Sequence, residues 1–369
     1  MSNKIKISIT IIIVILIVWI IASKGENPAS QNAPIKIGIS TALTGPAAFV
    51  GGSYFSGLKQ AQEEINAQGG IHGQQVELIV EDNKNNAQEG ITAFRSIETK
   101  KPDLFISTMS VPTVPVTPVV KESGIPQFVS LVFADMTSKN ENSVSFFPTA
   151  DDDVHATMQD MTLHKVKNVG VIYINSEYGQ ASLSAFLKQA KDNNINVIAQ
   201  ESFLDGALDY LTPLTKINAS KPDAVFIIAV NAIPIIKQLK AVKTNSLIYT
   251  TMTSAFGNLV NKDKETFEGV HVTASRVSIP GTDDYIRLRS TMKNAVATST
   301  LGYDALGYDS MYVIKAVLEK NPDAKDFVKT FANYGPFQGV NGSFNLNSRN
   351  IGMTLYPVVM KNGVLGEVK

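Results

Sequence analysis

Short apolar runs alternate with helical patterns along most of the chain, and this alternation limits the possible folds more than any other feature. It begins with an apolar run at residues 35–40 and a helical pattern over 54–68, and it continues through apolar runs at 76–81, 103–107 and 126–130. A strand followed by a helix and then by another strand forms a right-handed crossover in a parallel sheet. This region therefore predicts a doubly wound α/β unit.

The alternation restarts after residue 168 and predicts a second unit of the same kind. An apolar run at 168–175 precedes a helical pattern at 178–192. Further strand or helix patterns follow at 197–203, 224–230, 247–251, 270–275 and 303–319. Residues 342–368 resemble a hairpin with a turn at Asn362 and Gly363. We expect a second parallel sheet beside the first.

Two α/β lobes imply a hinge and a cleft between them. The chain has 369 residues, of which 44% are hydrophobic, and this is enough apolar material for two domains. The linking region is expected near residues 147–153. The first lobe is predicted to comprise 34–150 and 277–335, and the second lobe 151–276 and 336–369. Open α/β sheets bind ligands at the carboxyl ends of their strands, so the cleft is the expected binding site.

The N-terminus contains a segment that meets a membrane. Two lysines precede the apolar run Ile7–Ala22, whose length lies between a signal-peptide core and a bilayer span. Residues 1–22 are therefore expected to be a signal peptide or a membrane anchor, and the poor cleavage site at 20–22 favours an anchor at residues 5–22. Residues 23–33 are polar and predict a flexible linker. Either outcome places the remainder of the chain outside the cytoplasm.

Several classes of function are disfavoured by what the sequence lacks. The 33 basic and 33 acidic residues balance, so nothing attracts nucleic acid. No dinucleotide, phosphate-loop or hydrolase motif occurs, and no cofactor is expected. The acidic run at 151–153 could hold a cation, although capping of a helix is favoured. No metal site is expected from the histidines, which we predict to be ordinary surface or helix residues: His72, His155, His164 and His271.

Residues 35–82 closely resemble the N-terminal signature of the leucine/isoleucine/valine-binding family of type I periplasmic binding proteins. The similar features are the opening strand, the LTGP turn at 43–46, the EINAQGGIHG run at 64–73 and Asp82 at the end of the next strand. Weaker similarity continues to the end of the chain. The resemblance implies a two-lobed fold that closes around a small molecule.

The resemblance also implies residues for the binding site. In that family a small hydroxyl residue after the third strand holds the ligand carboxylate, and Ser110 matches it. A helix predicted to begin near Thr113 would offer free N–H groups to an anion, or Thr113 would simply cap it. Tyr178 matches an aromatic residue of the second lobe, although a core tyrosine is the competing interpretation. The expected ligand-binding residues are Phe49, Thr108, Ser110, Thr113, Leu131, Phe133, Tyr178, Asn231 and Thr253.

The chain departs from the family where amino-acid binders recognise the ammonium group. Leu131, Val132 and Phe133 stand where relatives have a small residue and then Ser or Thr, and residues 251–254 contain no carboxylate. A buried ammonium without a countercharge is costly. The expected ligand is a small amino acid or an apolar carboxylate or amide, and the missing countercharge disfavours the amino acid.

The function that follows is that of a binding protein without catalytic activity. The resemblance implies the substrate-binding protein of an ABC transporter of the branched-chain amino-acid type, with permease subunits as partners. The alternative is a receptor module that serves a separate signalling partner through the same cleft.

Overall fold

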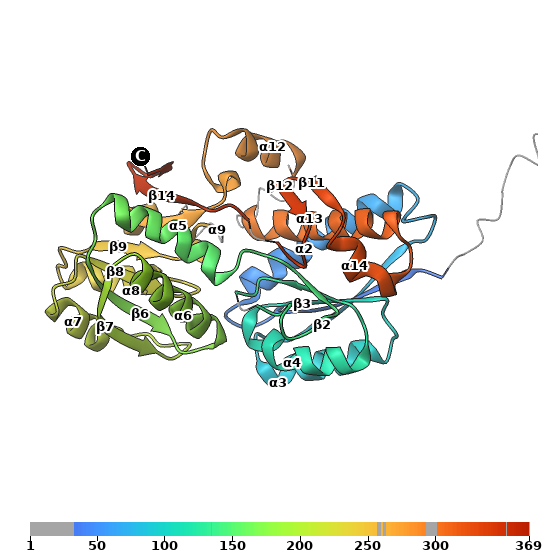
Figure 1. Cartoon of the computed structure of the whole chain (residues 1–369), viewed down its shortest axis with the longest axis horizontal. Helices are drawn as coiled ribbons and strands as arrows, with labels where there is room; N and C mark the ends of the chain where they lie inside the picture. Colours follow the sequence, from blue (N-terminus) through green and yellow to red (C-terminus); the bar gives the residue numbers. More distant parts are fainter. Residues whose placement is uncertain are drawn as a thin grey trace, which may run out of the picture.

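The computed structural model describes residues 33–133, 135–256, 260, 263–292, 301–351 and 353–368. The predicted N-terminal helix and nearly all of the predicted linker lie outside the described residues. Among the described residues, no helix combines the length and the apolar character needed to cross a bilayer. The described chain forms two bodies side by side (Figure 1). We call the blue, teal and orange body the first lobe and the green and yellow body the second lobe.

The first lobe is built on a parallel sheet of six strands with helices on both faces. Its strand order is β13 (Asn350–Ile351), β5 (Ser143–Phe146), β4 (Gln127–Ser130), β3 (Leu104–Thr108), β1 (Ile35–Thr41) and β2 (Val76–Asp82). An apolar cluster that includes Phe94, Phe105 and Val116 packs one face against two helices, and a larger cluster covers the other face. The covering helices are α3 (Ala87–Glu98) and α4 (Ser110–Ser123) on the first face, and α2 (Ala48–Ala67), α13 (Leu301–Lys320) and α14 (Phe327–Phe331) on the second.

The second lobe repeats this plan with a seven-stranded sheet. Its strand order is β15 (Val364–Glu367), β14 (Tyr356–Lys361), β10 (Val270–Ala274), β9 (Leu247–Thr250), β8 (Ala224–Ile228), β6 (Asn168–Ile174) and β7 (Asn196–Phe203). The pairs β10–β14 and β14–β15 are antiparallel, and the remaining pairs are parallel. The helices of this lobe are α5 (Ala150–Leu163), α6 (Glu177–Asp192), α7 (Leu211–Ala219), α8 (Ile233–Ala241), α9 (Met252–Phe256) and α11 (Lys264–Phe267).

The described chain passes between the lobes three times. It crosses after β5, after β10 and after β13, and α12 (Asp283–Thr291) follows the second crossing. The prediction that residues 336–369 all belong to the second lobe is wrong, because β13 pairs with β5 in the first sheet. The hairpin of β11 (Gly335–Gly339) and β12 (Gly342–Leu346) also packs there, with the rings of Phe344 and Phe146 4.8 Å apart. Of the described residues after 335, only those of β14 and β15 join the second sheet.

Helices α2 and α13 touch through their backbones where they cross. A Cβ atom added at Gly57 would lie 1.8 Å from the carbonyl oxygen of Asp304, and one added at Gly307 would lie 2.0 Å from that of Tyr54. Only glycine allows so close an approach. The Tyr54 hydroxyl also donates to Ser310 Oγ at 2.9 Å. The crossing thus fixes the position of α13 against the first sheet.

Helix α5 lies along β10 in the second lobe and is fixed at its start by carboxylates. Thr149 caps the helix and forms a reciprocal capping box with Asp152, so the expected capping role of the acidic run is confirmed for Asp152. Asp153 instead points inward, where its carboxylate accepts hydrogen bonds from Thr273 Oγ1 and the Met252 amide. Burial raises the pKa of Asp153 to about 7.

Replacing Gly57 by alanine should destabilise the protein, because the new methyl group overlaps the Asp304 carbonyl. We expect the free energy of unfolding to fall by about 2 kcal/mol or more. Gly52→Ala on the same helix is the matched control, since its Cβ would meet nothing within 4 Å. That control should be neutral or slightly stabilising. Equal urea midpoints for the two variants would contradict this account of the crossing.

The buried Asp153 should make stability depend on pH in an identifiable way. Its pKa is about 7 in the folded protein against 3.8 for the unperturbed group, so the folded state keeps the proton longer. Its contribution to stability is therefore present below pH 4 and declines as the pH rises from about 4 to about 7. Asp153→Asn should remove this decline, which amounts to at least about 1.4 kcal/mol. Urea unfolding between pH 4 and pH 8 measures it, with the exposed Asp151→Asn as control; parallel curves for Asp153→Asn and wild type would refute the assignment.

Candidate functional site

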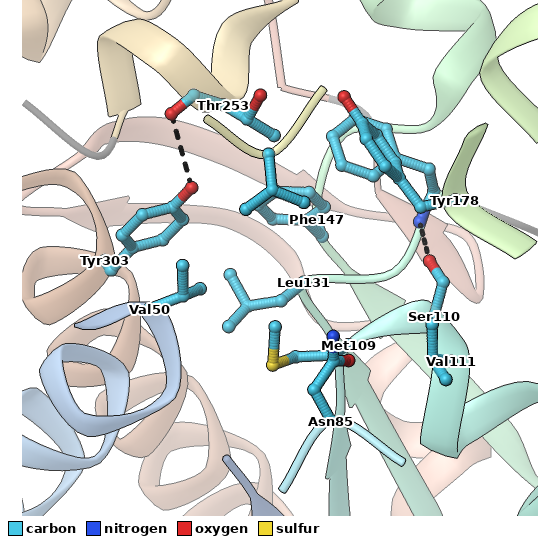
Figure 2. A pocket seen from close by; sticks show the side chains of 12 residues that line it. Val50, Asn85, Met109, Ser110, Val111, Leu131, Phe147, Tyr178, Thr253 and Tyr303 are labelled. Carbon is cyan, nitrogen blue, oxygen red and sulfur yellow. Dashed lines mark hydrogen bonds between the residues drawn. The ribbon is translucent and has the colours of Figure 1, made fainter. Parts of the chain in front are cut away.

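A cavity of about 60 Å³ lies between the lobes and receives side chains from both of them (Figure 2). It adjoins an outer cleft of about 320 Å³, with which it shares Asn85, Val111 and Val230. Sites for small molecules commonly enclose 300 Å³ or more, so the inner cavity must widen to admit a metabolite. Its lining residues are Val50, Asn85, Met109, Ser110, Val111, Leu131, Phe133, Phe147, Tyr178, Val230, Thr253 and Tyr303.

Two adjacent strands of the first sheet end at the cavity in the same unusual way. Met109 follows β3 with a φ of 71°, and Leu131 follows β4 with a φ of 59°. Positive φ is uncommon for residues other than glycine and is unfavourable, so it persists only where the surrounding structure enforces it. Figure 2 shows the two side chains next to each other at the cavity. The strained turns thus form part of the cavity wall.

Ser110 lies at the first position of α4, with its side chain at the cavity. Its Oγ accepts a hydrogen bond from the Phe133 amide at 3.3 Å, which leaves the hydroxyl proton for another partner. The first N–H groups of a helix have no partner within the helix and favour an anion. An oxygen atom of a carboxylate or amide that entered the cavity beside Ser110 would therefore meet hydrogen-bond donors.

The prediction that this helix begins near Thr113 is wrong. Helix α4 starts at Ser110, and the Thr113 amide already donates to the Met109 carbonyl at 3.1 Å. The Thr113 hydroxyl is buried and has no hydrogen-bond partner among the described residues, so it caps nothing. Thr108 is also buried, and its hydroxyl donates to Ser40 O and Thr41 Oγ1. Neither threonine lines the cavity.

Aromatic side chains join the two lobes across the cavity. The ring of Tyr178, from the first turn of α6, lies 4.9 Å from the ring of Phe133 in the first lobe. Phe133 in turn meets Phe147 edge to face at 5.2 Å. Such contacts add to the energy of burial. The lobes are therefore closed on each other at these rings.

Behind the rings, hydroxyl groups form a chain of hydrogen bonds in the second lobe. Tyr178 and Thr251 are 2.8 Å apart, Thr251 and Thr253 are also 2.8 Å apart, and Thr253 donates to the Ala229 carbonyl. Burial raises the pKa of the Tyr178 phenol, which stays neutral. A second contact crosses the lobes where the Tyr303 hydroxyl donates to the Thr253 carbonyl at 3.5 Å (Figure 2).

The twelve lining residues are all apolar, hydroxyl or amide residues, so none of them is charged at neutral pH. Asp304 follows Tyr303 in the chain, and burial raises its pKa to about 7, as it does for Asp153. The cavity therefore combines apolar walls with neutral hydrogen-bonding groups. It can hold an apolar ligand with one polar end, and none of the described residues that line it has a carboxylate to pair with an ammonium.

The structure brings together part of the predicted site. Ser110, Leu131, Phe133, Tyr178 and Thr253 line the inner cavity. Phe49 and Asn231 line the outer cleft instead, and the Asn231 side chain accepts a hydrogen bond from the Ile233 amide. Sequence reasoning did not select several lining residues as site residues: Val50, Asn85, Met109, Val111, Phe147, Val230 and Tyr303.

The missed residues differ in whether any signal could have found them. Met109 and Val111 flank Ser110, so the selection of Ser110 could have pointed to both of them. Val50 and Tyr303 reach the cavity from α2 and α13, whose packing no local pattern reveals. The prediction for the histidines is also wrong in one respect, because His271 is buried in β10 and meets His164 at Asp160.

Comparison with known proteins agrees with this architecture. Residues 34–363 match the family model described as periplasmic binding protein. The chain is 26% identical over 211 residues to a Leu/Ile/Val-binding protein of Rhizobium johnstonii and 24% identical over 196 residues to that of Escherichia coli. These matches cover 56% and 52% of this chain and 57% and 53% of the relatives, so the chain spans about half the length of the curated relatives it matches.

Solved structures share the fold over most of the chain. A leucine binding protein from Thermotoga maritima superposes with a TM-score of 0.81 at 19% identity, covering 91% of this chain and 98% of that one. A solute binding protein from R. palustris in complex with benzoate gives 0.79 at 17% identity, with 91% and 95% covered. A substrate binding protein from Streptococcus pneumoniae in complex with isoleucine gives 0.76 at 22% identity, with 91% and 99% covered. The chain belongs to the family of periplasmic binding proteins and has the type I fold.

Proposed function

We propose that this chain is the substrate-binding protein of an ABC transporter of the branched-chain amino-acid type. It works outside the cytoplasm, closes its lobes around a small molecule and delivers that molecule to permease subunits. The observation that carries the proposal is the cavity between the lobes, to which both lobes contribute side chains. Ligand contacts from both lobes form together only in the closed state, so a ligand would shift the protein towards closure.

The chemistry of the cavity favours one part of the expected ligand class. Its walls are apolar, Ser110 and the start of α4 offer donors, and no described lining residue can supply a negative charge. Leaving an ammonium group buried without a countercharge is costly. An apolar carboxylate or amide therefore suits the site better than a zwitterionic amino acid. The benzoate complex of the R. palustris protein is a precedent for such a ligand on this fold.

The N-terminal segment completes the proposal. We expect residues 5–22 to tether the protein to the cytoplasmic membrane and residues 23–33 to act as a flexible spacer. Fractionation of cells that express the full chain, with and without alkaline carbonate extraction, separates an anchored protein from a released one.

The preference for a ligand without an ammonium can be measured directly. Isocaproate is leucine without its amino group, and isocaproamide tests the neutral polar end. We expect isocaproate or its amide to bind at least about tenfold more tightly than leucine, because no described residue that lines the inner cavity offers the ammonium a counterion. Isothermal titration of the three compounds against the same protein gives the ratio. Tighter binding of leucine would restore an amino acid as the ligand.

Variants at the two sides of the cavity test the binding mode. Ser110→Ala should weaken binding about threefold to tenfold through the loss of one hydrogen bond. Tyr178→Ala should weaken it more by removing the aromatic wall, whereas Tyr178→Phe keeps the wall and should retain most of the affinity. Thr113→Val is the control, because this residue lies in the same helix but does not line the cavity. The affinity of each variant is measured by isothermal titration with whichever of the three compounds binds the wild type most tightly. Unchanged affinity in both Ser110→Ala and Tyr178→Ala would exclude the cavity as the site.

A further inference from the structure

Two histidines and one aspartate meet in the second lobe, at the end of the sheet away from the cleft. Asp160 and His164 lie one turn apart at the end of α5, and His271 is the second residue of β10. One oxygen of Asp160 lies 2.7 Å from His164 Nδ1, and its other oxygen lies 2.7 Å from His271 Nδ1. One potential ligand atom from each residue lies within 4.8 Å of the others. These three residues form what we call the His–Asp–His cluster.

Two members of the cluster are almost completely buried. Asp160 is 1% exposed and His271 is 5% exposed. Among the described residues, no lysine or arginine forms an ion pair with Asp160, whose ion-pair partners are the two imidazoles alone. Its carboxylate is held by the two imidazoles and by the Tyr249 hydroxyl, and no permanently charged side chain of the described residues pairs with it. A metal cation bound by the carboxylate and both rings would place a positive charge at this buried carboxylate.

The cluster is open on one side. His164 and His271 line a surface groove of about 450 Å³ together with residues of β14 and β15, among them Lys361 and Glu367. His164 has a side chain that is 35% exposed, so an ion can enter from solvent. The groove also leaves room for water to occupy the coordination positions that the three residues do not fill. Three protein ligands and an open position are the makeup of many zinc sites, and the ligand atoms, which lie within 4.8 Å of one another, would draw together to within about 4.3 Å around the ion.

The surroundings hold the ligands in place. The Tyr249 hydroxyl donates to Asp160 Oδ1 at 3.4 Å, and the Tyr249 ring stacks on His271 with centroids 4.7 Å apart. The two imidazoles meet edge to face at 4.8 Å. Outer groups that orient ligands in this way tune the affinity of metal sites.

We propose that Asp160, His164 and His271 bind a divalent transition-metal cation, for which zinc is the best match. Two imidazole nitrogens and one carboxylate oxygen suit zinc better than the hard cations magnesium or calcium. Nδ1 is the nitrogen of each ring that faces Asp160, so a metal bound there would replace the protons that these nitrogens share with Asp160 oxygens, and each ring would then carry its proton on Nε2. The metal joins the end of α5 to β10 and stabilises the second lobe. The site is independent of the ligand cleft and of the proposed transport function.

Zinc titration of the untagged full-length protein after chelator treatment tests the proposal. We expect one zinc ion per chain, weak or absent binding of magnesium, and an increase in the melting temperature with zinc. Cobalt should give visible absorption bands of a low-symmetry site. His164→Ala should weaken zinc binding about tenfold or more, and because His164 is partly exposed this variant should still fold.

The matched control is His155→Ala, an exposed histidine on the same helix whose Nε2 meets Gln159. It should bind zinc as the wild type does. Asp160→Asn should lose both zinc binding and the zinc-dependent rise in melting temperature. The proposal is overturned if the wild type binds no zinc, or if His164→Ala and His155→Ala bind it equally; the cluster would then be a hydrogen-bonded triad without a metal.

Discussion

The crossing of α2 and α13, where Gly57 and Gly307 each meet the backbone of the other helix, sets the geometry of the first lobe. It joins α2 from the start of the folded chain to α13 from its last part, with backbone against backbone. Further along the same pair of helices, Glu64 accepts hydrogen bonds from the hydroxyls of Tyr308 and Tyr312. The crossing places Val50 and Tyr303 near each other at the inner cavity (Figure 2). The shape of the cavity therefore depends on two glycines that do not line it.

Helix α5 plays the corresponding role in the second lobe. Asp153 and Asp160 lie two turns apart on its buried face, and each meets an alternate residue of β10, Thr273 or His271. Asp153 thus lies at the cleft end of the lobe and Asp160 at its far end. Burial raises the pKa of Asp153, and its side chain does not line the cavity. This arrangement keeps the ligand site free of ionised groups while the helix remains fixed at both ends.

The sequence was sufficient for those features that local patterns encode. The apolar runs marked the central strands of both sheets, and the resemblance to the leucine/isoleucine/valine-binding family led to Ser110. The start of α4 was missed because Pro112, Pro115 and Pro118 suggest a later or broken helix, whereas Pro112 fits within the first turn. Strand β13 was missed because it has two residues, too few for any periodicity.

Features that depend on distant packing left no local signal. The positive φ of Met109 and Leu131 occurs at residues with ordinary side chains, and only the folded sheet imposes it. His164 and His271 are far apart in the sequence and have no metal-ligand spacing. They meet because α5 lies along β10, which a reading of each segment alone does not reveal.

The late position of β13 in the chain has a consequence for how the protein folds. Until residues 350 and 351 pair with Ser145 and Phe146, β5 is an uncovered edge of the first sheet. The parallel core of the second lobe, from β6 to β10, comes from one uninterrupted stretch and can form earlier. A nascent chain that stalls before β13 would thus present an unpaired strand to its neighbours, and aggregation of such incomplete chains competes with folding.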